Sequence, residues 1–162
     1  DALAAAWLKQ HPQDTLFLFH LGNLALYEKD LAGAEARFQQ VLTLQPDNPY
    51  AHNNLAWTLA KLKQDGALDH AEKANTLMPN QPAFMDTLAT LLADSGKVKE
   101  AVDLQKKVIE LQPADNAFRL NLAKIYIKSG DKELARGELE RLAQLGNKFP
   151  AQKEVRELQA AL

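Results

Sequence analysis

The chain has 162 residues, of which 46% are hydrophobic and 25% are charged, and its formal net charge is −2. These values are typical of a folded globular chain and exclude disordered and collagen-like classes. The slightly negative charge argues against nucleic-acid binding, which needs a basic surface. The absence of cysteine excludes disulfides, thiolate metal sites and a cysteine nucleophile. No apolar stretch approaches the roughly 20 residues of a membrane-spanning helix.

The first segment, residues 1–14, reads as a helix that ends at Pro12. The chain begins with Asp1 rather than methionine, and it shows no charged segment followed by the apolar core of a secretory signal. We interpret residues 1–14 as the second helix of a repeat whose first helix is missing. We therefore expect the sequence to be a fragment of a longer protein.

Prolines give the chain an internal period, because Pro12, Pro46, Pro79 and Pro113 are separated by 34, 33 and 34 residues. The last three follow apolar helical runs, namely VLTLQP, ANTLMP and VIELQP. A period of about 34 residues with two helical segments is typical of the helix–turn–helix tetratricopeptide repeat. The chain resembles this family over nearly its whole length.

Four repeats follow the first segment, and we place them at residues 15–48, 49–81, 82–115 and 116–149. The first repeat carries the small, small, aromatic and proline residues of the family pattern, which are Gly22, Ala34, Phe38 and Pro46. Later repeats keep small residues at the same places, namely Ala56, Ala89, Ala101, Ala123 and Ala135.

Two features depart from the repeat pattern. The second repeat lacks one residue in the turn near Asp65 and Gly66, and Gln105 stands where a large apolar residue is usual. Residues 150–162 form a last helix with an apolar face of Val155, Leu158 and Leu162. Its other face is polar, with Lys153, Glu154, Arg156 and Glu157, and a polar outer face is what the cap of a solenoid requires. The resemblance implies an all-α fold without strands, a right-handed superhelix of about four helix pairs with a C-terminal capping helix.

No catalytic or metal-binding motif is present. The four histidines, His11, His20, His52 and His70, do not pair with one another or with acidic residues at metal-ligand spacing, so we expect them to be exposed or partly buried. The sequence also lacks HExxH, the two phosphate-binding glycine motifs and GxSxG. We therefore predict a protein that is not an enzyme and that has no metal site and no cofactor.

The remaining place for function is the concave surface that repeat arrays use for binding. In tetratricopeptide proteins the first helix of each repeat lines this groove, and aromatic and amide side chains there would hold a peptide or a sugar chain. The resemblance thus implies a protein or peptide partner, or a glycan, and no nucleic acid. The predicted groove residues are Phe19, Asn23, Tyr50, Asn53, Trp57, Asp86, Thr90, Lys124 and Lys128.

Other interpretations of these residues stay open at this point. Phe19 and Trp57 could pack between repeats, and Lys124 and Lys128 could form an ordinary solvated face. The family also has a clamp for a C-terminal carboxylate, which Asn23 and Asn54 match. Its three basic residues are missing, because the chain has Phe19, Ala83 and Thr87 at those places.

Residues 49–162 carry a more specific resemblance, through NNLAW at 53–57 and the ending LARGELERLAQLGNKFP. This region resembles the C-terminal part of bacterial tetratricopeptide lipoproteins of the PEP-CTERM/exosortase and exopolysaccharide systems, the PrsT type. The resemblance implies an adaptor for export or assembly, periplasmic or anchored to the outer membrane by a lipid-modified cysteine outside this sequence. The alternative is a soluble cytoplasmic adaptor or co-chaperone.

Overall fold

The computed structural model describes residues 2–162, and within this range it contains ten α-helices, one 3₁₀ turn and no β-strand. The all-α prediction is confirmed. The helices form two compact units, divided after Pro79, and each is described by itself below. The first unit contains α1 (Ala2–Gln10), α2 (Thr15–Tyr27), α3 (Leu31–Leu44), α4 (Pro49–Leu62) and α5 (Ala67–Leu77). The second contains α6 (Pro82–Asp94), α7 (Val98–Leu111), α8 (Asn116–Ser129), α9 (Lys132–Gln144), the 3₁₀ turn Gly146–Lys148 and α10 (Gln152–Ala160).

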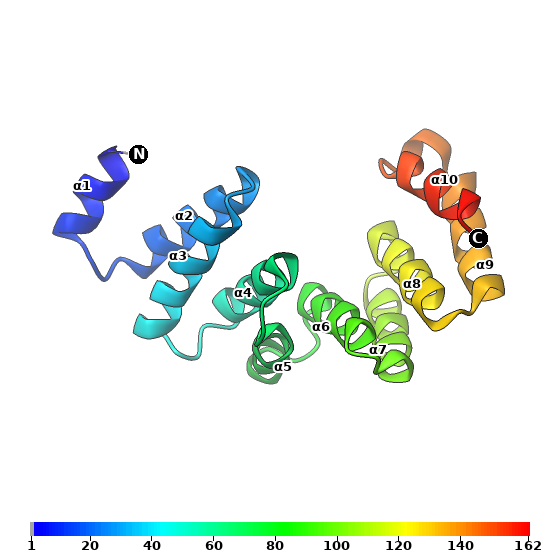
Figure 1. Ribbon diagram of the computed structural model, residues 1–162, viewed down its shortest axis with the longest axis horizontal. Coiled ribbons are helices and arrows are strands. Elements are labelled where there is room, and N and C mark those ends of the chain that lie inside the picture. Colours follow the sequence, from blue (N-terminus) through cyan, green and yellow to red (C-terminus); the bar gives the residue numbers. More distant parts are fainter. Residues whose placement is uncertain (1) are drawn as a thin grey trace. The chain divides into compact units, whose positions relative to one another are not determined.

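The helices pack as consecutive pairs, α2 with α3, α4 with α5, α6 with α7 and α8 with α9 (Figure 1). Within each unit the second helix of one pair also contacts the first helix of the next, α3 with α4 and α7 with α8. This arrangement is that of an α-helical solenoid of helix–turn–helix repeats. Among residues 2–162 no helix is both long enough and apolar enough to span a bilayer.

Polar residues cap the N-terminus of the first helix in several of the helix pairs. The Asp14 carboxylate accepts a hydrogen bond from the amide of Phe17 at 3.0 Å, and Asn48 accepts one from the amide of Ala51 at 3.0 Å. Both satisfy backbone donors that the first turn of a helix leaves without partners. In α6 the N-cap is Gln81, whose side chain makes no capping hydrogen bond, and Asn80 lies one residue earlier in the left-handed region with φ 63°.

Small residues allow the two helices of a pair to approach closely. Gly22 of α2 is buried against the ring of Phe38 of α3, and Ala34 of α3 is also fully buried. In the same unit, Leu18, Val41 and Ala51 form a buried apolar cluster. The small residues of the repeat pattern therefore act through close packing, as a dense protein interior requires.

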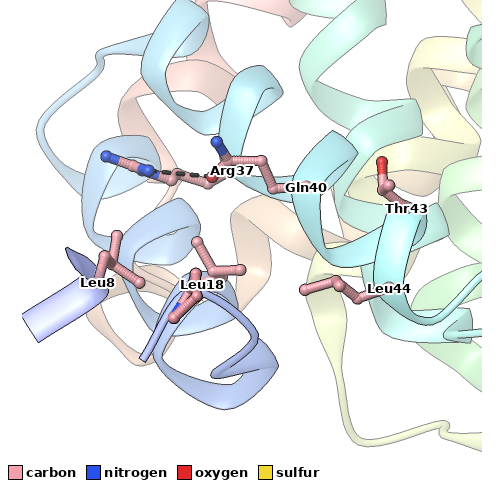
Figure 2. Close-up of a pocket in the computed structure, with 7 residues that line it drawn as sticks. Leu8, Leu18, Arg37, Gln40, Thr43 and Leu44 are labelled. Atoms are coloured by element: carbon pink, nitrogen blue, oxygen red, sulfur yellow. Dashed lines mark hydrogen bonds between the residues drawn. The ribbon is translucent and has the colours of Figure 1, made fainter. Parts of the chain in front are cut away.

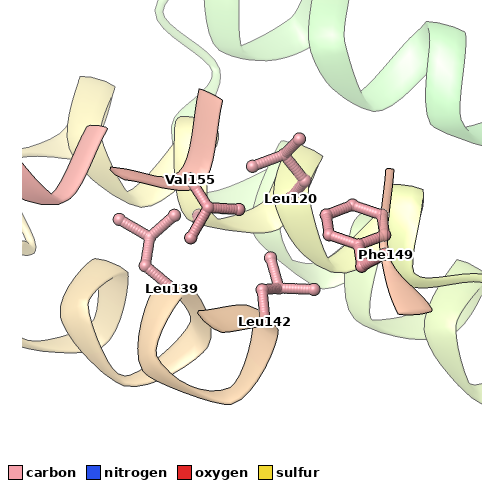
Figure 3. Close-up of a cluster of buried hydrophobic side chains, with 6 residues drawn as sticks. Leu120, Leu139, Leu142, Phe149 and Val155 are labelled. Atoms are coloured by element: carbon pink, nitrogen blue, oxygen red, sulfur yellow. The ribbon is translucent and has the colours of Figure 1, made fainter. Parts of the chain in front are cut away.

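The C-terminal helix α10 closes the core of the second unit. Val155 is fully buried between Leu139, Leu142 and Leu120, and Phe149 completes the cluster (Figure 3). Leu158 and Leu162 are partly buried against the same cluster. The predicted apolar face of a capping helix is thus confirmed.

Candidate functional site

Three asparagines join α2 and α4 on one face of the first unit. Asn54 donates from Nδ2 to Oδ1 of Asn23 at 2.8 Å, and Asn53 donates from Nδ2 to Oδ1 of Asn54 at 3.2 Å. Both hydrogen bonds run in the same direction, so the row uses the side-chain oxygen of Asn23 and not its Nδ2. We call Asn23, Asn53 and Asn54 the amide row. The sequence placed Asn23 and Asn53 in the groove but did not reveal that Asn54 links them.

Exposed aromatic side chains flank the amide row on α4. Tyr50 is 46% exposed and Trp57 is 41% exposed. The Nζ of Lys61 lies 5.2 Å from the centroid of the Trp57 ring, a cation–π contact. On α2, Leu16 and Tyr27 are still more exposed, at 83% and 86%. Accessible apolar side chains that gather on a surface typically mark a binding site.

Phe19 behaves differently from the other predicted groove residues of this unit. Its ring is partly buried, and its centroid lies 5.6 Å from that of Phe38 in the core. Phe19 therefore serves mainly to pack α2 on α3. The candidate surface of the first unit consists of the amide row with Tyr50 and Trp57.

In the second unit, the predicted groove lysines form ion pairs. Lys128 of α8 forms an ion pair with Asp94 of α6, and Lys124 of α8 forms one with Glu154 of α10 at 2.8 Å. These pairs link the first helices of neighbouring repeats with the capping helix. Lys124 and Lys128 thus have protein partners, in ion pairs that stay partly exposed to solvent.

Asp86 lies at the centre of a largely buried polar cluster. Its carboxylate accepts hydrogen bonds from Nε2 of Gln105 at 2.6 Å and from Nδ2 of Asn121 at 2.9 Å. Burial raises the pKa of Asp86 above its usual value, and these two hydrogen bonds oppose that rise. Thr90 also bonds internally, since its hydroxyl donates to the backbone oxygen of Asp86 at 3.0 Å.

Gln105, which departs from the repeat pattern, is explained by this cluster. Its side chain is fully buried, and its Nε2 also donates to the backbone oxygen of Phe118 at 2.9 Å. The unusual residue therefore provides a donor that a buried carboxylate requires. The hydrogen bonds of this cluster join α6, α7 and α8, so we assign it a role in stabilising the fold.

Two histidines that the sequence treated separately meet in the first unit. Nδ1 of His52 on α4 lies 2.8 Å from Nδ1 of His70 on α5. His70 is partly buried as expected, but His52 is buried, so the expectation of an accessible position is wrong for His52. The two residues are 18 positions apart in the sequence and lie on different helices. Only the packing of α4 against α5 brings their rings together. Within residues 2–162 no group of three or more potential ligands could hold a metal ion.

The described helices pack as consecutive helix–turn–helix pairs, and the candidate surface lies on the first helices of two such pairs, α2 and α4. Family models described as tetratricopeptide repeat match residues 1–49, 38–67 and 92–162. The chain belongs to the tetratricopeptide repeat family.

Named relatives are similar over part of the chain. A TPR repeat-containing protein of Pseudomonas aeruginosa is 32% identical over 108 residues, which are 65% of this chain and 18% of that protein. A small glutamine-rich tetratricopeptide repeat-containing protein of Mycosarcoma maydis is 29% identical over 103 residues, 63% of this chain and 29% of that protein. The chain thus matches less than a third of the length of either relative.

Solved structures share the fold at low sequence identity. The TPR protein YrrB, described as having an unusual peptide-binding site, is 20% identical with a TM-score of 0.75, over 96% of this chain and 81% of that one. A thermophilic TPR protein of Thermus thermophilus is 19% identical with a TM-score of 0.76, over 99% of this chain and 87% of that one. These likenesses establish the fold.

Proposed function

We propose that the chain is a non-enzymatic adaptor that binds an extended peptide of a partner protein on the α2/α4 face of the first unit. The observation that carries the proposal is the amide row, flanked by the exposed rings of Tyr50 and Trp57. Amide groups bind the main chain of a peptide, and rigid aromatic rings add contact area at low entropic cost. The two together suit a flexible ligand of varied sequence.

The direction of the amide row favours particular partner atoms. The oxygen of Asn23 accepts from Asn54, so Nδ2 of Asn23 is the group best placed to bind a ligand. Such a donor suits a peptide carbonyl oxygen. Lys61, which lies over the Trp57 ring, adds a positive charge to the same face. Every residue of a peptide main chain offers such a carbonyl acceptor, so we take an extended peptide as the ligand of this face.

The binding experiment uses a phage-displayed library of random peptides selected on the whole chain. Enriched peptides are then synthesised and titrated while the fluorescence of Trp57 is followed in a Trp7→Phe background, because the chain has two tryptophans. The effect of the groove residues is measured by anisotropy of labelled peptides. Combined Trp57→Ala and Asn23→Ala substitutions should cost about 2 kcal/mol or more if these residues form a hot spot.

The matched control is Leu134→Ala, which truncates an exposed apolar residue of α9. It should leave peptide affinity unchanged. Circular dichroism must show that the double variant keeps its helices. Peptides that bind the double variant as tightly as the unchanged chain would contradict the proposal, as would a selection that enriches no peptide at all.

We also propose a setting for this adaptor, on the C-terminal resemblance alone. The proposal places the parent protein in the bacterial envelope, periplasmic or outer-membrane-anchored, as part of a PEP-CTERM or exopolysaccharide export system. The second candidate is a cytoplasmic adaptor or co-chaperone. Fractionation of cells expressing the tagged parent protein tests the setting. Recovery with the membrane and release by cleavage of a lipid anchor are expected, whereas a cytosolic pool would favour the second candidate.

A further inference from the structure

A second surface of the first unit, separate from the α2/α4 face, forms a cavity of about 380 Å³. It lies between α1 and α3, with α2 beside it, and Figure 2 shows its lining. Apolar side chains reach it from all three helices, and polar side chains of α3 complete the lining. The apolar residues are Leu8, Pro12, Leu18 and Leu44, and the polar ones are Arg37, Gln40 and Thr43.

The cavity is large enough for a small ligand or the end of a peptide, since ligand pockets have volumes of about 300–1,000 Å³. Leu18 is buried within it, while Leu44 is 37% exposed. The cavity is therefore accessible from solvent beside Leu44. A mainly apolar hollow with a few polar groups is the usual form of a ligand site.

Arg37 gives the cavity lining a positive charge, and no acidic side chain within residues 2–162 forms an ion pair with it. Nη1 of Arg37 donates to Oε1 of Gln40 at 3.0 Å, and this pairing uses one of the five guanidinium donors. No acidic residue lines the cavity, and the ion pairs of the described chain do not include Arg37. A guanidinium beside apolar surface is well matched by a carboxylate, which it can bind through two parallel hydrogen bonds.

We propose that this cavity binds the C-terminal residue of a partner polypeptide when that residue is apolar. The last residue of a chain is the one place where an apolar side chain and a main-chain carboxylate belong to the same residue. The side chain would fill the space between Leu8, Leu18 and Leu44, and the carboxylate would meet Arg37. The opening beside Leu44 leaves room for the preceding chain to leave the site. This site does not depend on the proposed function of the α2/α4 face, because it shares no residue with the amide row, Tyr50 or Trp57.

The test titrates the whole chain with a fluorescein-labelled peptide, Gly-Ser-Gly-Ser-Leu, by fluorescence anisotropy. The peptide is used with a free C-terminal carboxylate and in an otherwise identical amidated form. Octanoate, which offers an apolar chain and a carboxylate without a peptide, serves as a second probe. Saturable binding of the free-acid peptide is expected, with about tenfold weaker binding of the amidated form because a charge-assisted pair is lost.

Two variants examine the role of the guanidinium without removing buried apolar atoms. Arg37→Gln removes the charge, and Gln40→Glu supplies an internal carboxylate where an amide oxygen now accepts from Arg37. Each should weaken peptide binding by about tenfold. The matched controls are Arg141→Gln and Gln144→Glu on α9, which have the same spacing on an exposed helix face and should leave affinity unchanged.

Any one of three binding results would overturn this assignment. They are equal affinity for the free-acid and amidated peptides, unchanged affinity in both Arg37→Gln and Gln40→Glu, and binding of octanoate without binding of the peptide. Amide chemical shifts of Arg37, Gln40 and Leu44 should move on titration. Shifts confined to α4 would place the peptide on the other face and would equally contradict the assignment.

Discussion

His52 and His70 share a hydrogen bond between their Nδ1 atoms, which lie 2.8 Å apart across the α4/α5 pair. The Nε2 of His52 lies 2.8 Å from the backbone oxygen of Pro46. A carbonyl oxygen only accepts, so His52 carries its proton on Nε2 and its Nδ1 accepts from Nδ1–H of His70.

The histidine pair should make the first unit less stable in mild acid. Burial lowers the pKa of His70, and the neighbouring His52 lowers it further, while Asp69 opposes the shift. The folded state therefore binds a proton less readily than the unfolded chain, whose histidines titrate near about 6.5. The contribution of this group to stability is complete above this pH and is lost as the pH falls below it. Urea unfolding between neutral pH and mild acid should show the loss.

A titration by NMR measures the same effect at a single residue. The His70 resonance should report a pKa below that of a histidine in the unfolded chain, and His52→Ala should raise it. The exposed His20→Ala is the control and should leave it unchanged. A His70 pKa that does not respond to His52→Ala would show that the rings do not interact.

Gly22→Ala should destabilise the first helix pair. A Cβ at this position would lie 2.6 Å from Cε1 of Phe38, and the ring of Phe38 is fully buried and cannot withdraw. Overpacking of this kind costs about 1–3 kcal/mol. Gly137→Ala in α9 is the control, because nothing lies within 4 Å of its added Cβ. It should be neutral or stabilising by up to about 1 kcal/mol, since alanine favours a helix.

Ala89→Leu and Ala101→Leu should each destabilise the second unit by about 1–3 kcal/mol. Both alanines are fully buried, one on each helix of the α6/α7 pair. Ala83→Leu on the exposed side of α6 is the control and should change the free energy of unfolding little. Equal losses in all three variants, measured by chemical denaturation, would show that the packing side of α6 is assigned incorrectly.

Asp86→Asn should cost about 1–3 kcal/mol at neutral pH, because its amide nitrogen would replace the Oδ2 oxygen that now accepts from Nδ2 of Asn121 at 2.9 Å. The pH dependence gives a second measurement. Burial raises the pKa of Asp86, so protonation favours the folded state and the unchanged chain gains stability from this group as the pH falls. The variant lacks this gain, so the difference in the free energy of unfolding between the variant and the unchanged chain should increase as the pH falls. A difference that decreases as the pH falls would contradict a raised pKa of Asp86.

Much of the fold could be predicted because its determinants are local and periodic. Gly22, Ala56 and Ala89 recur at the interval that brings two helices together. The helices α2, α4 and α6 begin at Thr15, Pro49 and Pro82, the residues chosen as repeat starts. Helix caps such as Asn48 act within a few residues of the chain. Local chemistry of this kind can be read without knowing which segments meet.

The candidate site could be predicted only in part, because its properties depend on which side chains meet. Tyr50, Trp57 and Phe19 were all predicted to line the groove from the first helix of a repeat. Tyr50 and Trp57 are exposed, whereas Phe19 packs on Phe38. Lys124 reads as an available cation in the sequence but lies 2.8 Å from Glu154 on the capping helix. A charge is available or neutralised according to its neighbours in space, and those come from other helices.

The sequence by itself determined the repeat and the helical class, because a period of about 34 residues with two helical segments in each repeat is typical of this fold. Only the tertiary structure decided that His52 meets His70, that Gln105 serves the buried Asp86, and that Arg37 stands beside an apolar cavity without an acidic partner within residues 2–162. The physical reason is that hydrogen bonds and ion pairs form over about 3 Å in space. Residues far apart in the chain acquire such contacts only when their helices pack.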